Sequence, residues 1–256
     1  MVIIHKPLLF CTNYAQGYDV NALKQVNIEP VAECALLVTF ETNQPQQLPF
    51  LIGSLTAEFY HRWHHVIMNI TPASQSILVD YLPHRISFEQ LSSYLRNCIE
   101  EHAQVTLNTS TAPAIKLPVY YALEVGPDIH RYQQNHIELD ELIELHTQLE
   151  YTVEAIGFAP GFAFMSDVHS KLRLPRLTTP RLMVPKGSVA IAESRTAVYP
   201  SDSPGGWNII GNCPINLYQP EHNPITPLQV GSRVQFYAVD RNEFVQLGGK
   251  LSRGFE

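Results

Sequence analysis

The chain of 256 residues has a formal net charge of −7, with 45% hydrophobic and 16% charged residues. This composition is typical of a globular protein with a buried core, in one large or two small domains. The negative charge argues against nonspecific binding to nucleic acid or to an anionic membrane. No apolar run approaches the roughly 20 residues of a membrane-spanning helix. We therefore expect neither nucleic acid nor a membrane as a partner.

The cysteines are scattered along the chain without a C-x-x-C pair, at Cys11, Cys34, Cys98 and Cys213. Such spacing favours reduced thiols over a disulfide framework or a zinc site. The apolar stretch Leu8–Cys11 is too short for the core of a signal peptide. We therefore predict a cytoplasmic protein without a metal site.

Residues 28–107 alternate between strand and helix patterns. Ala35–Phe40 is a candidate buried strand, and apolar residues then recur at three- and four-residue spacing through residues 48–63, which predicts an amphipathic helix. Two strands follow at 66–70 and 76–82, and Ser87 with Gln90 forms a capping box that opens a second helix. The pattern predicts a small α/β domain whose antiparallel strands carry helices on one face, preceded by an N-terminal extension at 1–27.

The polar residues 108–113 are typical of a linker. Leu117–Tyr121 is a candidate strand, and Gly126-Pro127-Asp128 begins a helix with proline near its first position. A further helix is expected at 139–149, with His146 on its apolar face. That histidine is either a core residue hydrogen-bonded to the backbone or a functional group.

Prolines and glycines recur between Pro160 and Gly211 at positions that a helix would not tolerate. Short β-branched runs, such as Ser188–Ala192 and Asn208–Gly211, lie between them. This alternation predicts short strands joined by tight turns, which is the pattern of a small barrel at 114–256. Further strands are expected at 215–218, 233–239 and 244–247.

Basic residues are concentrated in the same stretch. Between positions 171 and 195 only one acid, Glu193, accompanies six of the 17 basic residues, namely Lys171, Arg173, Arg176, Arg181, Lys186 and Arg195. Such a cluster favours a pocket for a carboxylate or phosphate, because it focuses a positive field. Alternatively, the Pro-Arg pairs only solvate exposed loops.

The glycine pair Gly205-Gly206 can present consecutive backbone N–H groups to an anion, and so can Gly161 after Pro160. The alternative is that both are simple β-turns. Trp207 either walls a pocket or fills the core. Hydroxyl groups near the expected pocket come from Ser188, Thr196, Tyr199 and Ser203. The sequence has no P-loop, no G-x-S-x-G and no H-E-x-x-H motif.

Several of these blocks occur together in a specific order. GFAPGFAF (157–164), VPKGSVAIA (184–192), TAVYP (196–200) and SPGGWNIIG (203–211) closely resemble the allophanate hydrolase subunit 1 family. That family includes the B subunit of bacterial 5-oxoprolinase and the KipI inhibitors of sporulation kinases. The resemblance is strong over about 115–240 and loose over 29–105.

The resemblance implies a fold with an α+β N-terminal domain followed by a mainly-β, cyclophilin-like barrel domain. For the 5-oxoprolinase branch, it implies ATP-dependent opening of 5-oxo-L-proline to L-glutamate. It also implies two partners, a homologous C subunit and a third, A subunit, with ATP shared between this chain and a partner.

On this hypothesis the functional side chains surround one hollow. The residues expected to be catalytic are His146 and Lys186. Those expected to bind the substrate or another anion are Arg176, Arg181, Ser188, Thr196, Tyr199, Gly205 and Gly206. The expected pocket wall consists of Pro160, Gly161, Phe162 and Trp207.

The alternative from a different class is a KipI-type inhibitor that binds a sensor histidine kinase and blocks its autophosphorylation. Its expected anchors are apolar and aromatic residues, namely Phe158, Phe162, Phe164 and Trp207. Peptidyl-prolyl isomerase activity has less support, because a barrel fold alone does not carry that chemistry.

Overall fold

A computed structural model describes residues 23–104, 113–222 and 224–251. Contacts divide the chain into two compact units, unit 1 at Met1–Ala112 and unit 2 at Pro113–Glu256. The expected linker at 108–113 lies outside the described residues except for its last residue, as does the expected extension up to residue 22. None of the described helices is both long and apolar enough to cross a membrane.

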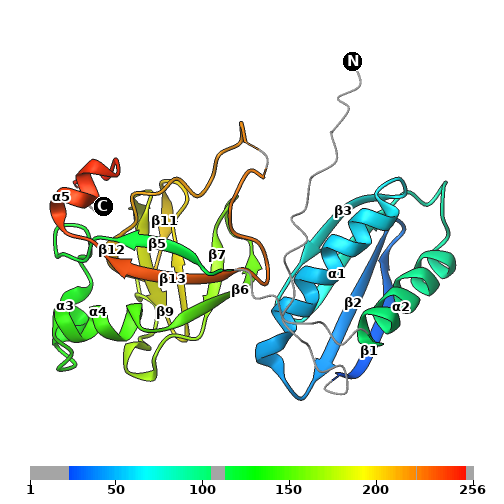
Figure 1. Ribbon diagram of the computed structural model, residues 1–256, viewed down its shortest axis with the longest axis horizontal. Coiled ribbons are helices and arrows are strands. Elements are labelled where there is room, and N and C mark those ends of the chain that lie inside the picture. The colour runs from blue at the N-terminus through cyan, green and yellow to red at the C-terminus, as the bar shows by residue number, and fades with distance from the viewer. Residues whose placement is uncertain (1–22, 105–112, 223, 252–256) are drawn as a thin grey trace. The chain divides into compact units, whose positions relative to one another are not determined.

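Unit 1 is a four-stranded antiparallel sheet with strand order β1-β2-β4-β3. The strands are β1 (Leu23–Ala32), β2 (Ala35–Thr42), β3 (Ile67–Pro72) and β4 (Ser76–Tyr81). A short 3-10 turn, η2 (Pro45–Gln47), leads into α1 (Leu48–Trp63), and α2 (Phe88–Gln104) follows β4. Both helices cover the same face of the sheet (Figure 1).

The apolar stripe of α1 forms the core of unit 1. Its residues Leu48, Ile52, Leu55 and Phe59 are fully buried, and the helix packs against the sheet at β3 and β4. The N-terminus of α2 has the predicted capping box, in which Gln90 N donates to Ser87 Oγ and Ser87 N donates to Gln90 Oε1, both at 3.2 Å. These local patterns therefore predicted both helices correctly.

Unit 2 contains a seven-stranded mixed sheet with strand order β12-β9-β10-β7-β6-β13-β5. Its strands are β5 (Ile115–Val119), β6 (Glu150–Ile156), β7 (Ala163–Ser166), β9 (Ser188–Ala192), β10 (Arg195–Val198), β12 (Asn208–Asn212) and β13 (Arg233–Ala238). Among the described strands of this sheet, only β13 and β5 pair in parallel. An antiparallel bridge between Tyr120 and Asn212 joins the two ends of the sheet, so the sheet is a nearly closed barrel.

The barrel encloses one hydrophobic core. Side chains from all seven strands contribute, among them Val119, Val153, Met165, Ile191 and Phe236. The helices α3 (Ile129–Gln133) and α4 (Leu139–Thr147) lie beside each other next to the barrel (Figure 1). They add Ile129, Tyr132 and Leu142 to this core.

A second apolar cluster lies on the outer face of the barrel. Along β9, Val189 and Ile191 belong to the inner core while Ala190 and Ala192 belong to the outer cluster, which is the alternation expected of a strand buried on both faces. A two-stranded ribbon, β8 (Arg181–Val184) with β11 (Ser203–Gly205), contributes Val184 to this outer cluster.

Two of the expected strands are wrong. Residues 215–218 form no strand. Residues 244–247 belong mostly to a helix, α5 (Arg241–Gln246), because the Asp240 carboxylate accepts a hydrogen bond from Glu243 N and caps its N-terminus. Unit 2 also contains a 3-10 turn, η3 (Ser170–Leu172).

Candidate functional site

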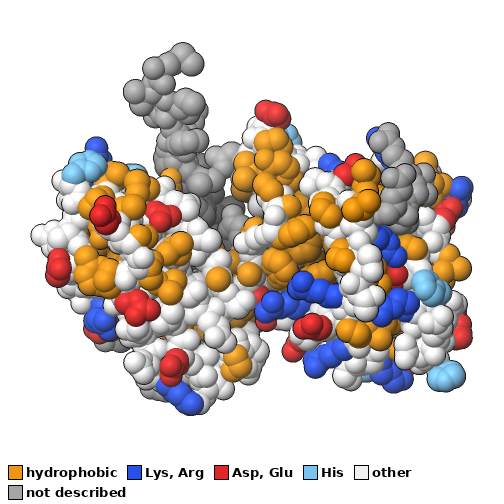
Figure 2. Space-filling view, turned by 180° about the vertical axis from the view of Figure 1, so that it is seen from behind, with side chains coloured by type: hydrophobic (Ala, Val, Ile, Leu, Met, Phe, Trp, Pro, Cys, Tyr) orange, Lys and Arg blue, Asp and Glu red, His pale blue; other side chains and the backbone are white. Residues whose placement is uncertain are grey.

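Most of the expected cationic cluster is neutralised. Four of its six basic residues form ion pairs with acids outside residues 171–195: Lys171 with Glu141 at 2.6 Å, Arg173 with Asp167 at 3.5 Å, Arg181 with Asp128 at 2.9 Å and Arg195 with Glu154 at 2.9 Å. Figure 2 shows acidic side chains among the Lys and Arg side chains of unit 2, on the right. The predicted positive field is therefore much weaker than the local sequence suggested.

Arg181 is held by a buried carboxylate. Its two terminal nitrogens donate to the two carboxylate oxygens of Asp128, each at 2.9 Å, and Ile209 N also donates to Asp128 at 2.7 Å. The Asp128 side chain is 2% exposed and that of Arg181 18%. This forked pair fixes β8 to the loop before α3, which corrects the expectation that Arg181 is available for a substrate anion.

His146 lies inside the barrel and is completely buried. Its ring stacks on Phe236 with centroids 4.6 Å apart. Its Nδ1 lies 2.7 Å from the Tyr121 hydroxyl, and its Nε2 lies 3.0 Å from Thr196 Oγ1. Because Thr196 donates its hydroxyl proton to Ala190 O at 3.1 Å, Thr196 accepts from His146 Nε2–H, and His146 Nδ1 accepts from Tyr121.

Burial lowers the pKa of His146 to about 3, because the charged imidazolium loses its hydration inside the barrel. The ring is therefore neutral at physiological pH, and both nitrogens have partners. These contacts support the core interpretation, with side-chain partners in place of the expected backbone partner. They argue against His146 as a proton relay at an open pocket. Thr196, which was expected to bind an anion, is buried and belongs to the same chain of hydrogen bonds.

The aromatic residues predicted as pocket wall fill the outer cluster. Phe162 and Trp207 are 2% and 6% exposed, and their rings meet edge to face at 5.6 Å. Arg176 is exposed, and its guanidinium lies 5.9 Å from the centre of the Trp207 ring. Core filling is therefore the role that the structure gives to Trp207.

Tyr199 and the glycine pair meet beside this cluster. Tyr199 is buried, and burial raises its pKa to about 12. Gly205 pairs with Arg181 in the β8–β11 ribbon, and a Cβ atom at Gly205 would lie 2.2 Å from the Tyr199 hydroxyl. Gly206 O accepts from Leu177 N at 2.7 Å. Gly205 therefore allows close packing of the ribbon against Tyr199.

The remaining residues predicted for the site lie in a turn or inside the barrel domain. Pro160 and Gly161 form a turn in which Phe162 N donates to Ala159 O at 2.9 Å, which matches the β-turn interpretation. Ser188 is completely buried, and its hydroxyl has no hydrogen-bond partner among the described residues. The described residues contain no group of three or more His, Cys, Asp or Glu side chains that could hold a metal.

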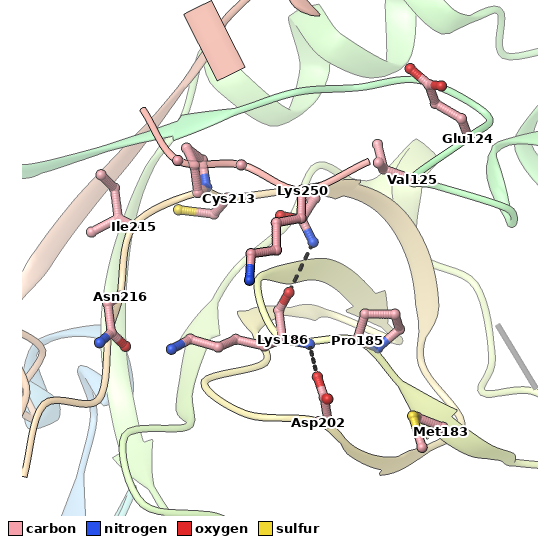
Figure 3. A pocket seen from close by; sticks show the side chains of 14 residues that line it. Glu124, Val125, Met183, Pro185, Lys186, Asp202, Cys213, Ile215, Asn216 and Lys250 are labelled. Atoms are coloured by element: carbon pink, nitrogen blue, oxygen red, sulfur yellow. Dashed lines mark hydrogen bonds between the residues drawn. The ribbon is translucent and has the colours of Figure 1, made fainter. Parts of the chain in front are cut away.

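Lys186 lies apart from these residues, in a pocket of about 450 Å³ (Figure 3). We call it the lysine pocket; its lining consists of Glu124, Val125, Met183, Pro185, Lys186, Asp202, Asn212, Cys213, Pro214, Ile215, Asn216, Gly248, Gly249 and Lys250. Of the residues predicted from the sequence, only Lys186 lines it. The expectation that Lys186 shares one hollow with Arg181, Gly205 and Gly206 is therefore wrong for this pocket.

The backbone of Lys186 is fixed on both sides. Its N–H donates to Asp202 Oδ1 at 2.7 Å, and its carbonyl accepts from Asn212 Nδ2 at 3.1 Å (Figure 3). Gly187 follows with φ +83, and a Cβ atom there would lie 2.5 Å from Cys213 O. The side chain of Lys186 therefore projects from a rigid turn. Burial raises the pKa of the neighbouring Cys213 thiol to about 12, so Cys213 is not a thiolate nucleophile.

The chain is similar to known proteins in sequence and in structure. The chain is 32% identical to the B subunit of 5-oxoprolinase from Bacillus subtilis over 85% of this chain and 94% of that protein. It is also 32% identical to the B subunit of 5-oxoprolinase from Haemophilus influenzae, over 82% of this chain and 97% of that protein. The crystal structure of TTHA0988 matches 80% of this chain with a TM-score of 0.69 and 28% identity, and this chain spans 39% of that longer chain.

The model of one family, described as the carboxyltransferase domain, subdomains C and D, matches residues 26–228. This match covers most of both units, and the 5-oxoprolinase relatives agree with the resemblance carried by the sequence motifs. The chain therefore belongs to this carboxyltransferase-domain family, together with the B subunits of 5-oxoprolinase.

Proposed function

We propose that this chain is the B subunit of an ATP-dependent 5-oxoprolinase, which opens 5-oxo-L-proline to L-glutamate together with the C and A subunits as partners. The observation that carries the proposal is the 32% identity to proteins of this name over more than 80% of the chain. A cytoplasmic location agrees with the described cysteines Cys34, Cys98 and Cys213, which are free thiols.

The proposed architecture follows the family resemblance. Residues 28–107 form a small α/β domain, and residues 114–256 form a cyclophilin-like barrel domain. The nearly closed seven-stranded sheet of unit 2 supports the second assignment. The helices on one face of the unit 1 sheet support the first.

The substrate of this reaction is an anion with a small ring. A pocket of about 450 Å³ is within the usual range for small ligands, and Lys186 in its wall suits a carboxylate oxygen as a point charge. Lys186 is therefore the residue we propose for holding the substrate. Arg176, exposed above Trp207, is a second candidate for anion binding, at a separate place.

ATP would supply the phosphoryl group that turns the unreactive amide oxygen into a leaving group. The chain has no P-loop, and the lysine pocket offers cations without a glycine-rich phosphate loop. We therefore propose that ATP binds at a site shared with one of the partners. His146, which is buried and neutral, has no role in this proposal.

The kinase-inhibitor alternative has less support. The similar proteins are named as 5-oxoprolinase subunits. Of its expected anchors, Phe162 and Trp207 are packed into the outer cluster, and only Phe158, at 65%, is largely exposed. An interface hot spot needs aromatic side chains that a partner can reach.

The test is reconstitution. The chain is co-purified with the products of the neighbouring genes for the C and A subunits, and 5-oxo-L-proline-dependent ATP hydrolysis is measured. We expect turnover by the assembly and none by this chain alone. An assembly without turnover would refute the assigned reaction, whereas turnover by the lone chain would refute the need for partners.

A further inference from the structure

The turn after α5 carries a second lysine into the lysine pocket. Gly248, with φ +91, turns the chain back at the end of the helix, where Gly248 N donates to Val245 O at 3.0 Å and Gly249 N donates to Phe244 O at 2.9 Å. This is the usual way in which glycine ends a helix. Lys250, which follows Gly249, lines the pocket.

Close packing fixes this turn. A Cβ atom at Gly249 would lie only 2.4–2.6 Å from atoms of the Phe244 ring, and Phe244 itself is completely buried against Tyr120. A larger residue before Lys250 would therefore have to displace the buried Phe244 ring or shift the turn. Lys250 is placed by the fold of α5 and by this contact.

Two cations thus face one pocket. The side chains of Lys186 and Lys250 both extend toward Asn216 in the view of Figure 3. No described acid forms an ion pair with either lysine. Two ammonium groups that share a concave surface repel each other, so an anion between them removes an unfavourable interaction and adds two favourable ones.

The acids of the pocket are already engaged. Glu124 accepts from the Tyr120 hydroxyl at 2.8 Å and from Arg241 at 3.3 Å. Asp202 accepts the backbone N–H of Lys186 at 2.7 Å. The two ammonium groups therefore remain available to a ligand from solution.

The rest of the wall indicates the kind of anion. Apolar contact surface comes from Val125, Met183, Pro185, Pro214 and Ile215. An inorganic phosphate has no apolar part to place against these side chains, whereas a small ring that bears a carboxylate has both parts. The shape and chemistry of the pocket therefore favour a carboxylate with a compact apolar body.

We propose that Lys186 and Lys250 together bind the carboxylate of a small cyclic amide acid, and that this chain alone suffices for that binding. The identification of the acid as 5-oxo-L-proline rests on the proposed function. Lys250 is then a second substrate-binding residue, delivered by the glycine turn after α5.

The experiment measures binding to the full chain without its partners, by calorimetry or by ligand-observed NMR. The probes are 5-oxo-L-proline, its uncharged carboxamide and inorganic phosphate. We expect 5-oxo-L-proline to bind more tightly than either of the others, with an affinity that falls as salt is added. Equal binding of the carboxamide, or tighter binding of phosphate, would overturn the proposal.

Charge-removing variants test the two lysines separately. Lys186→Met and Lys250→Met should each weaken 5-oxo-L-proline binding by about three- to tenfold, because each loses one solvent-accessible charged contact. The matched control is Lys116→Met, since Lys116 lines a different pocket beside Thr147 and Gln235 and carries the same charge. An equal loss in all three variants, or none with Lys250→Met, would contradict the two-lysine site.

The variant Gly249→Ala tests the delivery of Lys250 while keeping both lysines. It should weaken 5-oxo-L-proline binding about as much as Lys250→Met. Loss of turnover in the reconstituted assembly with intact binding to the lone chain would refute the proposed reaction only. Absence of binding to the lone chain in an active assembly would refute this inference only.

Discussion

The forked pair between Asp128 and Arg181 offers a direct test of what the basic residues of unit 2 do. The Asp128 carboxylate is almost inaccessible to solvent and accepts three hydrogen bonds, two from Arg181 and one from Ile209 N. We consider two single changes, Asp128→Asn and Arg181→Met, and their combination. Each single change leaves one buried charge without its main partner.

Breaking a buried pair by removing one partner costs about 3–5 kcal/mol, since the remaining charge stays desolvated. For a domain of this size, 1 kcal/mol shifts the melting temperature by about 2–4 °C, so each single change should lower it by about 6–20 °C. The double variant should lose less than the sum of the two single losses, because neither charge is left behind. Lys171→Met is the surface control: Lys171 is 59% exposed in its pair with Glu141, and its loss should cost at most about 1 kcal/mol.

The assay combines thermal unfolding with binding of 5-oxo-L-proline to those variants that remain folded at the measuring temperature. A structural role for Arg181 predicts a large loss of stability and unchanged affinity. An Arg181→Met protein with an unchanged melting temperature and lost binding would refute this reasoning and would restore Arg181 as an anion-binding residue.

Three further changes test separate parts of the fold. His146→Gln keeps a donor and an acceptor but cannot titrate. Because the pKa of His146 is about 3 in the folded protein and about 6.5 when unfolded, the unfolded state gains the proton first. Relative to this variant, the free energy of unfolding of the unsubstituted protein should therefore fall by up to about 1.4 kcal/mol per pH unit below pH 6.5. Urea unfolding at pH 7 and pH 5 measures the difference. Ser87→Ala removes the cap of α2 and should cost about 1 kcal/mol, seen as faster amide hydrogen exchange in α2 but not in unit 2. Gly187→Ala forces a Cβ against Cys213 O in a left-handed conformation, which costs at least about 1 kcal/mol; it should lower stability and 5-oxo-L-proline affinity together, and unchanged affinity would argue against the role of this turn.

Where a short stretch of sequence determines the structure, the sequence was sufficient to predict it. The stripe of α1 and the Ser87–Gln90 capping box are local patterns, and the barrel strands β9 and β12 are marked by β-branched runs between turns. The ordered motifs from 157 to 211 identified the family. A local signal was also present for α5, since Asp240 and Glu243 mark a helix start, and using it would have corrected the expected strand at 244–247.

The candidate site depended on partners far along the chain. Asp128 lies 53 positions before Arg181, and the count of charges between 171 and 195 could not include it. His146 meets Thr196 across 50 positions, which only the closed barrel brings about. Lys250 joins Lys186 through the turn after α5, and no spacing in the sequence relates the two. The sequence therefore pointed to Lys186, which lines the pocket, but gave no sign of Lys250; the catalytic role expected for Lys186 stays a prediction.

The bridge that closes the barrel also forms part of the lysine pocket. Asn212 pairs with Tyr120 through its backbone, and its side chain holds the carbonyl of Lys186. The part of the pocket wall formed by Asn212 and Lys186 is therefore as rigid as the barrel itself, and a ligand would meet a surface there that needs no rearrangement. Changes in ligand preference during evolution would then fall on other lining residues, such as Met183, Asn216 and Lys250, which can be exchanged without reopening the sheet.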